Sequence, residues 1–335
     1  MKRMLLYFLR KILTYAVVFF VALTIFYFLL QLAPGDPVLR YVREMESRYG
    51  YNTGTTETGA QAFRAQFGLD KSIPLRYLSF MKELLLKGNF GPSIVSYPVP
   101  AQVGVFQALP WSIGLLGVST IISWVLGMGL GTMLGWRRGK ALDSAVTPFA
   151  ITLAQMPQYL MAILLSMVFV YAIVVFPSGG AYSAALNRSW SLPFIGSVVY
   201  HAILPSMSIV VVGLLGWSLQ QRAMVISLLG EDYMRLAEAK GLPRLRLVNR
   251  YILRNTMLPQ VTGLALSLGA VVNGYFLIEW IFRYPGIGSL FVNAIRTLDY
   301  NVLLCITVIS MLMVLLANLF LEFLYPLIDP RIRRG

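Results

Sequence analysis

Apolar residues along the chain are grouped into six long runs, and most of the polar residues lie in the stretches between them. A helix that crosses the hydrocarbon core of a bilayer needs about 20 mostly apolar residues. The pattern predicts such helices over residues 12–32, 111–136, 146–176, 198–219, 257–278 and 302–324. The first run is too long for the apolar part of a signal peptide, and no small-residue cleavage site follows it, so we expect it to stay in place as a helix.

Composition favours a membrane protein. Of the 335 residues, 57% are hydrophobic and 13% are charged, whereas a soluble domain carries about 25% charged residues. The low charge content argues against an ordinary soluble domain, and the high hydrophobic content excludes intrinsic disorder. The expected fold class is therefore all-α, a polytopic membrane protein with six transmembrane helices.

The formal net charge of +14 is distributed unevenly along the chain. Six spans place both termini on one side, and that side would hold 17 of the 28 lysines and arginines and a net charge of +11, against +3 on the other side. Because cytoplasmic loops of membrane proteins are enriched in Lys and Arg, we expect both termini in the cytoplasm. A nucleic-acid-binding protein carries its basic residues on a polar chain, so no nucleic acid partner is expected.

This topology divides the chain into three parts. Residues 1–33 hold a cytoplasmic N-terminal segment and the first span, and residues 34–106 form an extracytoplasmic segment. Residues 107–335 hold the other five spans and include a polar cytoplasmic loop at 222–255.

Within the extracytoplasmic segment, residues 43–60 are rich in Gly, Thr, Glu and Tyr, which is typical of an exposed loop. The pattern then predicts short helices over 60–68 and 74–87, and Gly88 ends the second of them.

Residue types for metal or thiol chemistry are nearly absent from the sequence. Cys305 is the one cysteine and His201 the one histidine, which excludes intramolecular disulfides and zinc sites built on histidine pairs. The phosphate-binding pattern G-x-x-x-x-G-K-[ST] does not occur. We therefore predict no metal site, no ATP site and no cofactor in this chain.

Polar residues inside the predicted spans are uncharged. A buried ionisable residue usually marks an ion path or a proton relay, and none lies deep in the six runs. Gln155, Gln158, Asn273 and Asn318 are candidates for the lining of a transport pathway, although hydrogen bonding between helices explains each of them equally well. Residues 155–158 predict a break in the third helix, because Pro157 cannot continue the helical hydrogen bonds.

A stripe of glycines follows one side of the second predicted span. Gly127, Gly131 and Gly135 recur every four residues, and small residues at this spacing let two helices approach closely in a membrane. We expect another helix to pack against this stripe.

The cytoplasmic loop contains a short helix with clear ends. Residues 231–241 begin with two acidic residues and finish at Gly241, the order that the helix dipole and the C-cap favour. Pro243 forbids continuation, and a basic second helix is predicted over 244–254. This shape suits docking to a partner, but an interfacial pair of helices with arginines at the lipid head groups is the alternative that composition alone favours.

Short motifs follow one another along nearly the whole chain: Pro34-Gly35-Asp36-Pro37, Gly88-Asn89-Phe90-Gly91, Leu109-Pro110, Leu142-Asp143, His201-Ala202-Ile203-Leu204-Pro205, Asp232-Tyr233-Met234-Arg235-Leu236-Ala237, Ala239-Lys240-Gly241, Leu253-Arg254-Asn255, Pro285-Gly286-Ile287-Gly288, Asp299-Tyr300 and Asp329-Pro330-Arg331. Each is weak by itself, but their order and spacing together are specific. With these motifs the chain resembles the permease subunits of ABC importers of the dipeptide/oligopeptide/nickel type, the inner-membrane components of binding-protein-dependent transport systems.

The resemblance implies a type I ABC importer permease fold and a role for the cytoplasmic loop. In such permeases this stretch is the coupling helix, which inserts into a groove of the ATPase subunit. By resemblance, the docking residues would be Tyr233, Arg235, Ala237, Lys240 and Gly241. On the outer side, Asp36, Glu279 and Asp299 are candidates for contact with the solute-binding protein.

The resemblance also implies partners and a location. We expect a second homologous permease subunit, two ATPase subunits that hold ATP and Mg, an extracytoplasmic solute-binding protein and the lipid bilayer of a bacterial or archaeal plasma membrane. The chain itself would not be an enzyme. The expected substrate is a dipeptide or oligopeptide, with an oligosaccharide as the alternative. The outer segment departs from the family at Pro92 and in the length of the loop at 43–60.

Two other classes of protein compete with this hypothesis. An ion-coupled secondary carrier predicts an inverted repeat and a buried charge, and the sequence displays neither. A membrane-embedded enzyme predicts a cluster of His, Asp, Glu, Cys or activated Ser near one membrane face, and the outer carboxylates have no histidine beside them in the sequence.

Overall fold

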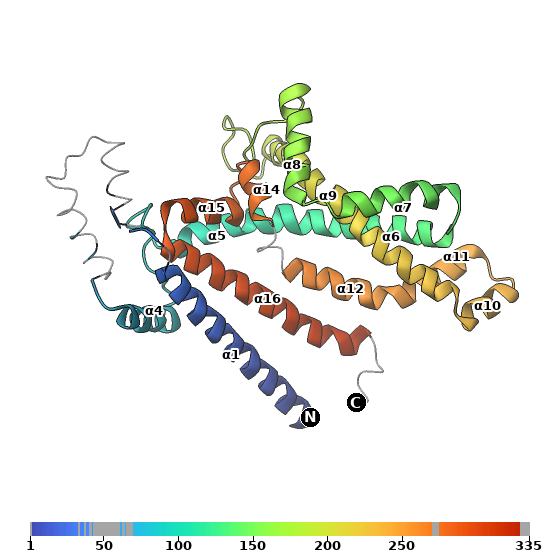
Figure 1. Ribbon diagram of the computed structural model, residues 1–335, viewed down its shortest axis with the longest axis horizontal. Helices are drawn as coiled ribbons and strands as arrows, with labels where there is room; N and C mark the ends of the chain where they lie inside the picture. Colours follow the sequence, from blue (N-terminus) through green and yellow to red (C-terminus); the bar gives the residue numbers. More distant parts are fainter. Residues whose placement is uncertain are drawn as a thin grey trace. The chain divides into compact units, whose positions relative to one another are not determined.

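The computed structural model describes residues 2–32, 34–36, 38–39, 42, 61, 64, 70–269 and 275–328 (Figure 1). Within these ranges the chain forms helices and no strand. They are α1 (Lys2–Leu32), α4 (Ile73–Lys87), α5 (Ala101–Ser112), α6 (Val118–Trp136), α7 (Ala141–Ala154), α8 (Gln158–Ser166), α9 (Leu192–Leu229), α10 (Asp232–Ala239), α11 (Arg244–Arg246), α12 (Arg254–Gly269), α14 (Phe276–Ile281), α15 (Ile287–Thr297) and α16 (Tyr300–Ile328). π-Helical stretches continue α5, α8 and α11 as η1 (Ile113–Gly117), η2 (Met167–Ala172) and η3 (Leu247–Leu253).

Long apolar helices account for most of the predicted spans. In the described ranges, four helical segments are long and apolar enough to cross a membrane: Leu9–Leu32, Ala101–Trp136, Leu192–Leu229 and Tyr300–Leu319. Ala141–Ala154 and Gln158–Ala172 pass the same test together and are bent by 100° at the break between them. They make a fifth span if the bent pair counts as one. The span expected at 257–278 is not among these membrane-crossing segments. α12 ends at Gly269, and residues 270–274 are not among those that the structure describes.

Two helices run well beyond the apolar runs that predicted them. The second span begins at Ala101 rather than at residue 111, and α9 continues to Leu229 rather than ending near residue 219. Residues 220–229 contain neither glycine nor proline, so the helix continues after its hydrophobic run has ended. The cytoplasmic loop expected from residue 222 therefore starts as helix.

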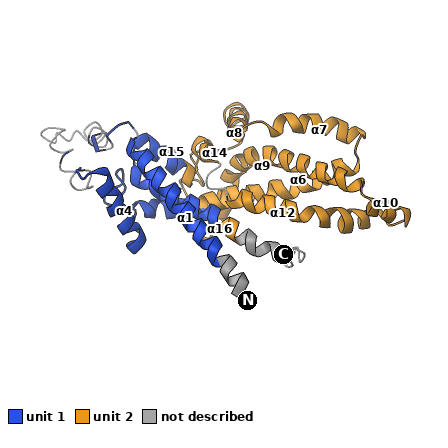
Figure 2. Cartoon of the chain, turned by 60° about the horizontal axis from the view of Figure 1, so that its bottom comes forward, with its two compact units in different colours: residues 1–110, 289–315 blue, residues 111–288, 316–335 orange. Residues whose placement is uncertain are grey.

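The chain forms two compact units (Figure 2). One consists of residues 1–110 and 289–315, and the other of residues 111–288 and 316–335. Each unit is built from two separate stretches of sequence. The predicted division at residues 33 and 106 follows the sides of the membrane instead and stays a prediction.

In the first unit, α4 is held against α1 by polar and aromatic contacts. The hydroxyl groups of Thr24 and Tyr77 lie 2.6 Å apart, and Arg76 donates a hydrogen bond of 3.0 Å to Gln31. The ring of Tyr27 packs against those of Tyr77 and Phe80. The helix predicted at 74–87 is confirmed, and Gly88 ends it with a left-handed φ of 61°. The predicted loop at 43–60 lies outside the described residues, as does most of the helix predicted at 60–68.

In the second unit, α6 packs directly on α9 along the predicted glycine stripe. A Cβ added at Gly127 would lie 2.8 Å from the carbonyl oxygen of Leu214, and one at Gly135 would lie 2.6 Å from Cβ of Val225. Between them, a Cβ at Gly131 would collide with the carbonyl oxygen of Ser218. The two backbones approach so closely that only glycine fits, which confirms the prediction.

Candidate functional site

The short helix of the cytoplasmic loop is α10, and both of its ends are defined by backbone contacts. The carbonyl of Glu231 accepts a hydrogen bond of 3.0 Å from the N–H of Met234 at the start, and the N–H of Gly241 donates one of 2.8 Å to Glu238 at the end. Gly241 has a left-handed φ of 70°, which glycine adopts without strain. After Pro243 the chain is helical again from Arg244 through η3 into α12. The predicted helix, break and second helix are confirmed.

One face of α10 is buried in this chain. Met234 is 0% exposed and Ala237 is 3% exposed, and both pack in a cluster with Val225 of α9 and with Leu247 and Ile252 of η3. Ala237 thus packs against neighbouring helices of its own chain, and its docking role stays a prediction.

The opposite face of α10 is open to solvent. We call the surface formed by the following exposed residues the "α10 outer face": Tyr233, Arg235, Leu236, Lys240 and Gly241. Leu236 is 57% exposed and was not among the predicted docking residues. Four of the five predicted docking residues lie on this face.

The third predicted span is interrupted where its sequence indicated. α7 ends at Ala154 and α8 begins at Gln158, with Pro157 as its N-cap residue. A cavity of about 530 Å³ opens at this bend. Its lining consists of Ala154, Met156, Pro157, Gln158, Tyr159, Val212, Tyr275, Phe276, Leu277 and Ile278.

The predicted pathway residues do not all meet at this cavity. Gln158 lines it, whereas Gln155 is exposed and is not part of the lining. Asn318 is half-buried on α16, and Asn273 lies outside the described residues. Gln158 thus lines a cavity, and a pathway function stays a prediction for all four residues.

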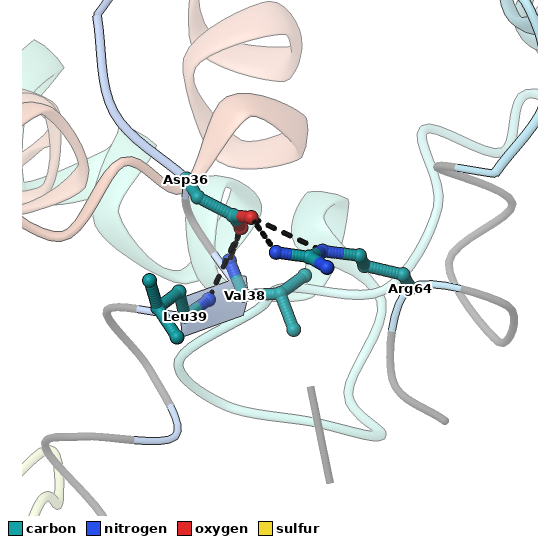
Figure 3. A network of polar contacts seen from close by, with 4 residues as sticks. All are labelled: Asp36, Val38, Leu39 and Arg64. Carbon is teal, nitrogen blue, oxygen red and sulfur yellow. Dashed lines mark hydrogen bonds and ion pairs between the residues drawn. The ribbon is translucent and has the colours of Figure 1, made fainter. Parts of the chain in front are cut away.

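Asp36 caps the turn that follows the first span (Figure 3). One carboxylate oxygen accepts hydrogen bonds from the backbone N–H groups of Val38 and Leu39, at 2.9 and 3.1 Å, and the other forms an ion pair with Arg64. Partial burial raises the pKa of the Asp36 carboxyl, but the hydrogen bonds and the charge of Arg64 outweigh this and lower it below its ordinary value. Its side chain remains about one-third exposed, at 32%.

Asp299 and Glu279, the other candidates for contact with a solute-binding protein, are buried. Asp299 is 2% exposed and accepts hydrogen bonds from the hydroxyl of Ser93, at 2.6 Å, and the N–H of Ile94, at 3.0 Å. Burial raises the pKa of its carboxyl, while these hydrogen bonds act in the opposite direction. Glu279 is 1% exposed and accepts a hydrogen bond of 2.6 Å from the N–H of Gly288. Neither side chain is exposed in this chain, each carboxylate holds nearby backbone N–H groups, and contact with a solute-binding protein stays a prediction.

Two buried polar groups were missed by the sequence analysis. Asp143, 4% exposed, forms an ion pair with Arg222, with 2.6 Å between Oδ1 and Nε. One residue earlier on α9, the amide of Gln221 donates to the hydroxyls of Thr132 and Thr256 and accepts from Gln260. The partners are 35 to 89 residues apart in sequence, so local patterns could not reveal them, although the motif Leu142-Asp143 did mark one.

No metal centre is formed by the residues that the structure describes. Among them, no group of three or more His, Cys, Asp or Glu side chains is placed to hold an ion.

Residues 127–334 match the family described as binding-protein-dependent transport system inner membrane component. The chain belongs to this family. The match includes the α7–α8 bend, the cavity beside it and α10. As an inner membrane component with several apolar helices, the protein is a multi-pass membrane protein.

Other proteins resemble this inner membrane component over most of their length. The oligopeptide transport system permease protein AppB of Bacillus subtilis is 29% identical over 304 residues, which make up 91% of this chain and 92% of AppB. The oligopeptide transport system permease protein OppB of Mycobacterium bovis is 31% identical over 272 residues, or 79% of this chain and 82% of OppB.

The fold is also found among solved structures. A chain of the MetNI methionine ABC transporter in an inward-facing conformation matches with a TM-score of 0.50 and 14% identity, covering 67% of this chain and 96% of that one. This likeness is one of fold, and it confirms the predicted type I ABC importer permease architecture.

Proposed function

We propose that this chain is one permease subunit of an ATP-driven ABC importer and forms half of a translocation pore for dipeptides or oligopeptides. The observation that carries the proposal is the likeness to AppB, which spans more than nine-tenths of both chains and bears the name of an oligopeptide transport system permease.

The proposal includes an assembly of several subunits. The chain pairs with a second homologous permease subunit, two ATPase subunits bind at the cytoplasmic side, and a solute-binding protein delivers the peptide from outside. ATP and Mg belong to the ATPase subunits, so this chain is not itself an enzyme. Both termini lie in the cytoplasm, as the excess of Lys and Arg on that side favours.

The α10 outer face is the surface that docks on an ATPase subunit. Its exposed Leu236 gives a partner groove an apolar anchor, and Arg235 and Lys240 flank it with positive charge. Buried apolar anchors with a charged rim are the usual anatomy of a specific interface. The buried face of the same helix, with Met234 at 0% exposure, ties any movement of α10 to α9 and η3.

The cavity at the α7–α8 bend is part of the path that the peptide takes. Its volume of about 530 Å³ lies within the range of small-ligand sites. Tyr159 and Tyr275 offer aromatic surface, and the amide of Gln158 can donate to and accept from a peptide group. Such a wall accepts side chains of different character, which suits a transporter of varied peptides.

The substrate is tested with the purified complex of both permease subunits and both ATPases in lipid. Adding the solute-binding protein loaded with peptide should raise ATP hydrolysis, and the same protein incubated with oligosaccharide should not. Stimulation by the oligosaccharide alone would overturn the peptide assignment. A rate of ATP hydrolysis that is the same with and without each substrate would count against an importer.

The docking surface is tested by disulfide cross-linking. Cys305 is buried and free, so Cys305→Ala gives a cysteine-free background. Leu236→Cys, on the outer face, should form a cross-link with a cysteine placed in the ATPase groove. Met234→Cys, two residues away and buried, is the matched control and should not. Equal cross-linking of both variants would contradict the assignment.

A further inference from the structure

A partly buried ion pair joins the first turn of α7 to the C-terminal part of α9. The carboxylate of Asp143 accepts two hydrogen bonds from Arg222, 2.6 Å from Nε to Oδ1 and 2.9 Å from Nη2 to Oδ2. A guanidinium and a carboxylate paired through two parallel bonds have a fixed relative orientation as well as mutual attraction.

The rest of the Asp143 carboxylate is also engaged. Oδ2 accepts a hydrogen bond of 2.9 Å from the N–H of Gly139, and Oδ1 accepts one of 2.8 Å from the hydroxyl of Thr147. Gly139 has a left-handed φ of 74°, so the tight turn that aims its N–H at the carboxylate suits glycine. Four donors from the turn, from α7 and from α9 thus converge on one carboxylate.

Arg222 lies next to the contacts that hold α10. Val225, one turn further along α9, is 0% exposed, packs in one cluster with Met234 and Ala237 of α10, and faces Gly135 of α6. A displacement of α10 therefore reaches Val225 first and Arg222 within the same helical turn. From Arg222 the pair with Asp143 leads directly into the turn where α6 ends and α7 begins.

We propose that Asp143 and Arg222 are positioning residues for energy coupling, which make the α6–α7 turn and the inner end of α9 move as one body with α10. The inference rests on the proposed coupling function of α10. Without the pair, α10 would still dock and the ATPases would still cycle, but part of the movement would be absorbed in the turn at residues 137–143.

Stability alone is a poor explanation of this pair. Replacing a buried ion pair with apolar residues is often neutral or stabilising, since two charges must be taken out of water to form it. What the pair supplies that apolar packing does not is a single fixed orientation between two segments. This fixed geometry is what a mechanical link between α10 and the spans requires.

The test compares peptide uptake with ATP hydrolysis in the complete complex in proteoliposomes. Asp143→Asn keeps the shape of the side chain and removes its charge. We expect ATP hydrolysis to stay near the wild-type rate while the peptide taken up per ATP falls about fivefold or more, the size of a typical coupling between sites. Glu83→Gln, which breaks the exposed pair of Glu83 with Lys87 on α4, is the matched control and should leave this ratio unchanged.

Two milder variants keep the test decisive if Asp143→Asn fails to assemble. Arg222→Lys retains the charge but removes the paired geometry, and Thr147→Val removes one hydrogen-bond donor to Asp143. Both should lower the peptide taken up per ATP, and Thr147→Val should lower it by less. The exchange Asp143→Arg with Arg222→Asp should restore part of it. An unchanged ratio in the assembled variants would overturn this inference alone, whereas a wild-type complex without ATP-dependent uptake would overturn the proposed function.

Discussion

The ring of Tyr233 stacks on the ring of Tyr251, with their centroids 6.5 Å apart and their planes 20° from parallel. Asn255 adds a hydrogen bond of 3.2 Å from its Nδ2 to the hydroxyl of Tyr233. Tyr233 lies at the start of α10, Tyr251 in η3 and Asn255 at the start of α12. The proposed coupling helix is thus tied to the helix that follows it by an aromatic contact and a hydrogen bond.

This contact predicts graded effects at Tyr233. Tyr233→Phe keeps the stacking and loses the hydrogen bond, and peptide uptake should fall only slightly. Tyr233→Ala loses both, including about 0.5–1.5 kcal/mol of stacking free energy, and uptake should fall much further while the complex still assembles. Uptake and ATP hydrolysis measured side by side check this. Equal uptake by the two variants would mean that the stacking does not matter for coupling.

Gly241 offers a second test of the α10 outer face. In the described surroundings, no atom lies within 4 Å of a Cβ added there, and its φ of 70° suits glycine. Gly241→Asn should keep most of the uptake, because asparagine tolerates this backbone at a cost of about 1 kcal/mol or less. Gly241→Arg adds bulk at the proposed ATPase contact and should abolish uptake without loss of membrane insertion. Similar uptake by the two variants at equal expression would contradict docking at this position.

The close packing of α6 on α9 predicts a sharp contrast between neighbouring glycines. Gly131→Ala drives a methyl group into the carbonyl of Ser218 and should destabilise the chain by about 1–3 kcal/mol. Gly129→Ala is the matched control on the same helix, since within the described residues nothing lies within 4 Å of its Cβ position. Melting of the purified variants in detergent measures both. Equal melting temperatures would show that the stripe is not tightly packed in solution.

Acid should loosen the turn at Asp36. Because its folded-state pKa lies below the ordinary value of 3.8, the ionised carboxylate stabilises the turn above pH 3.8, and this stabilisation is lost as the pH falls through the lowered pKa. Hydrogen exchange at Val38 and Leu39, corrected for the intrinsic effect of pH, should be constant from pH 7 to 5 and should rise in stronger acid.

Asp36→Asn removes the charge that this effect requires. Exchange at the two amides should already be faster at pH 7 and should lose the acid-dependent rise. Glu83→Gln changes another carboxyl whose pKa is lowered, on the exposed face of α4, and should leave these amides unaffected. Wild-type protection in Asp36→Asn would show that Arg64 and the two N–H groups do not depend on this carboxylate.

The sequence predicts those features that depend on local chemistry. A bilayer requires long apolar runs, so the cores of most spans could be placed. Pro157 breaks its helix, Gly241 ends α10 and Pro243 separates it from the next helix, because these residues act on their own backbone. The glycine stripe was informative because a close contact between helices restricts the residue type.

Features that depend on distant neighbours could not be predicted. The sequence predicts the ends of α10, but only the cluster that Ala237 forms with Val225 shows that this side chain is buried. Asp143 and Arg222 are 79 residues apart, and neither position alone indicates a partner. Glu279 and Asp299 are candidates for an outer contact by their position in the sequence, but their burial and their hydrogen bonds from backbone N–H groups could not be predicted from it.

The importer hypothesis is tested most directly by uptake of a labelled peptide into proteoliposomes that contain the complete complex, with the solute-binding protein added on its docking side. The peptide should accumulate only when ATP is present on the ATPase side, and omitting either the ATPases or the binding protein should abolish accumulation. Peptide uptake by this chain without ATP and without ATPase subunits would contradict an ATP-driven importer.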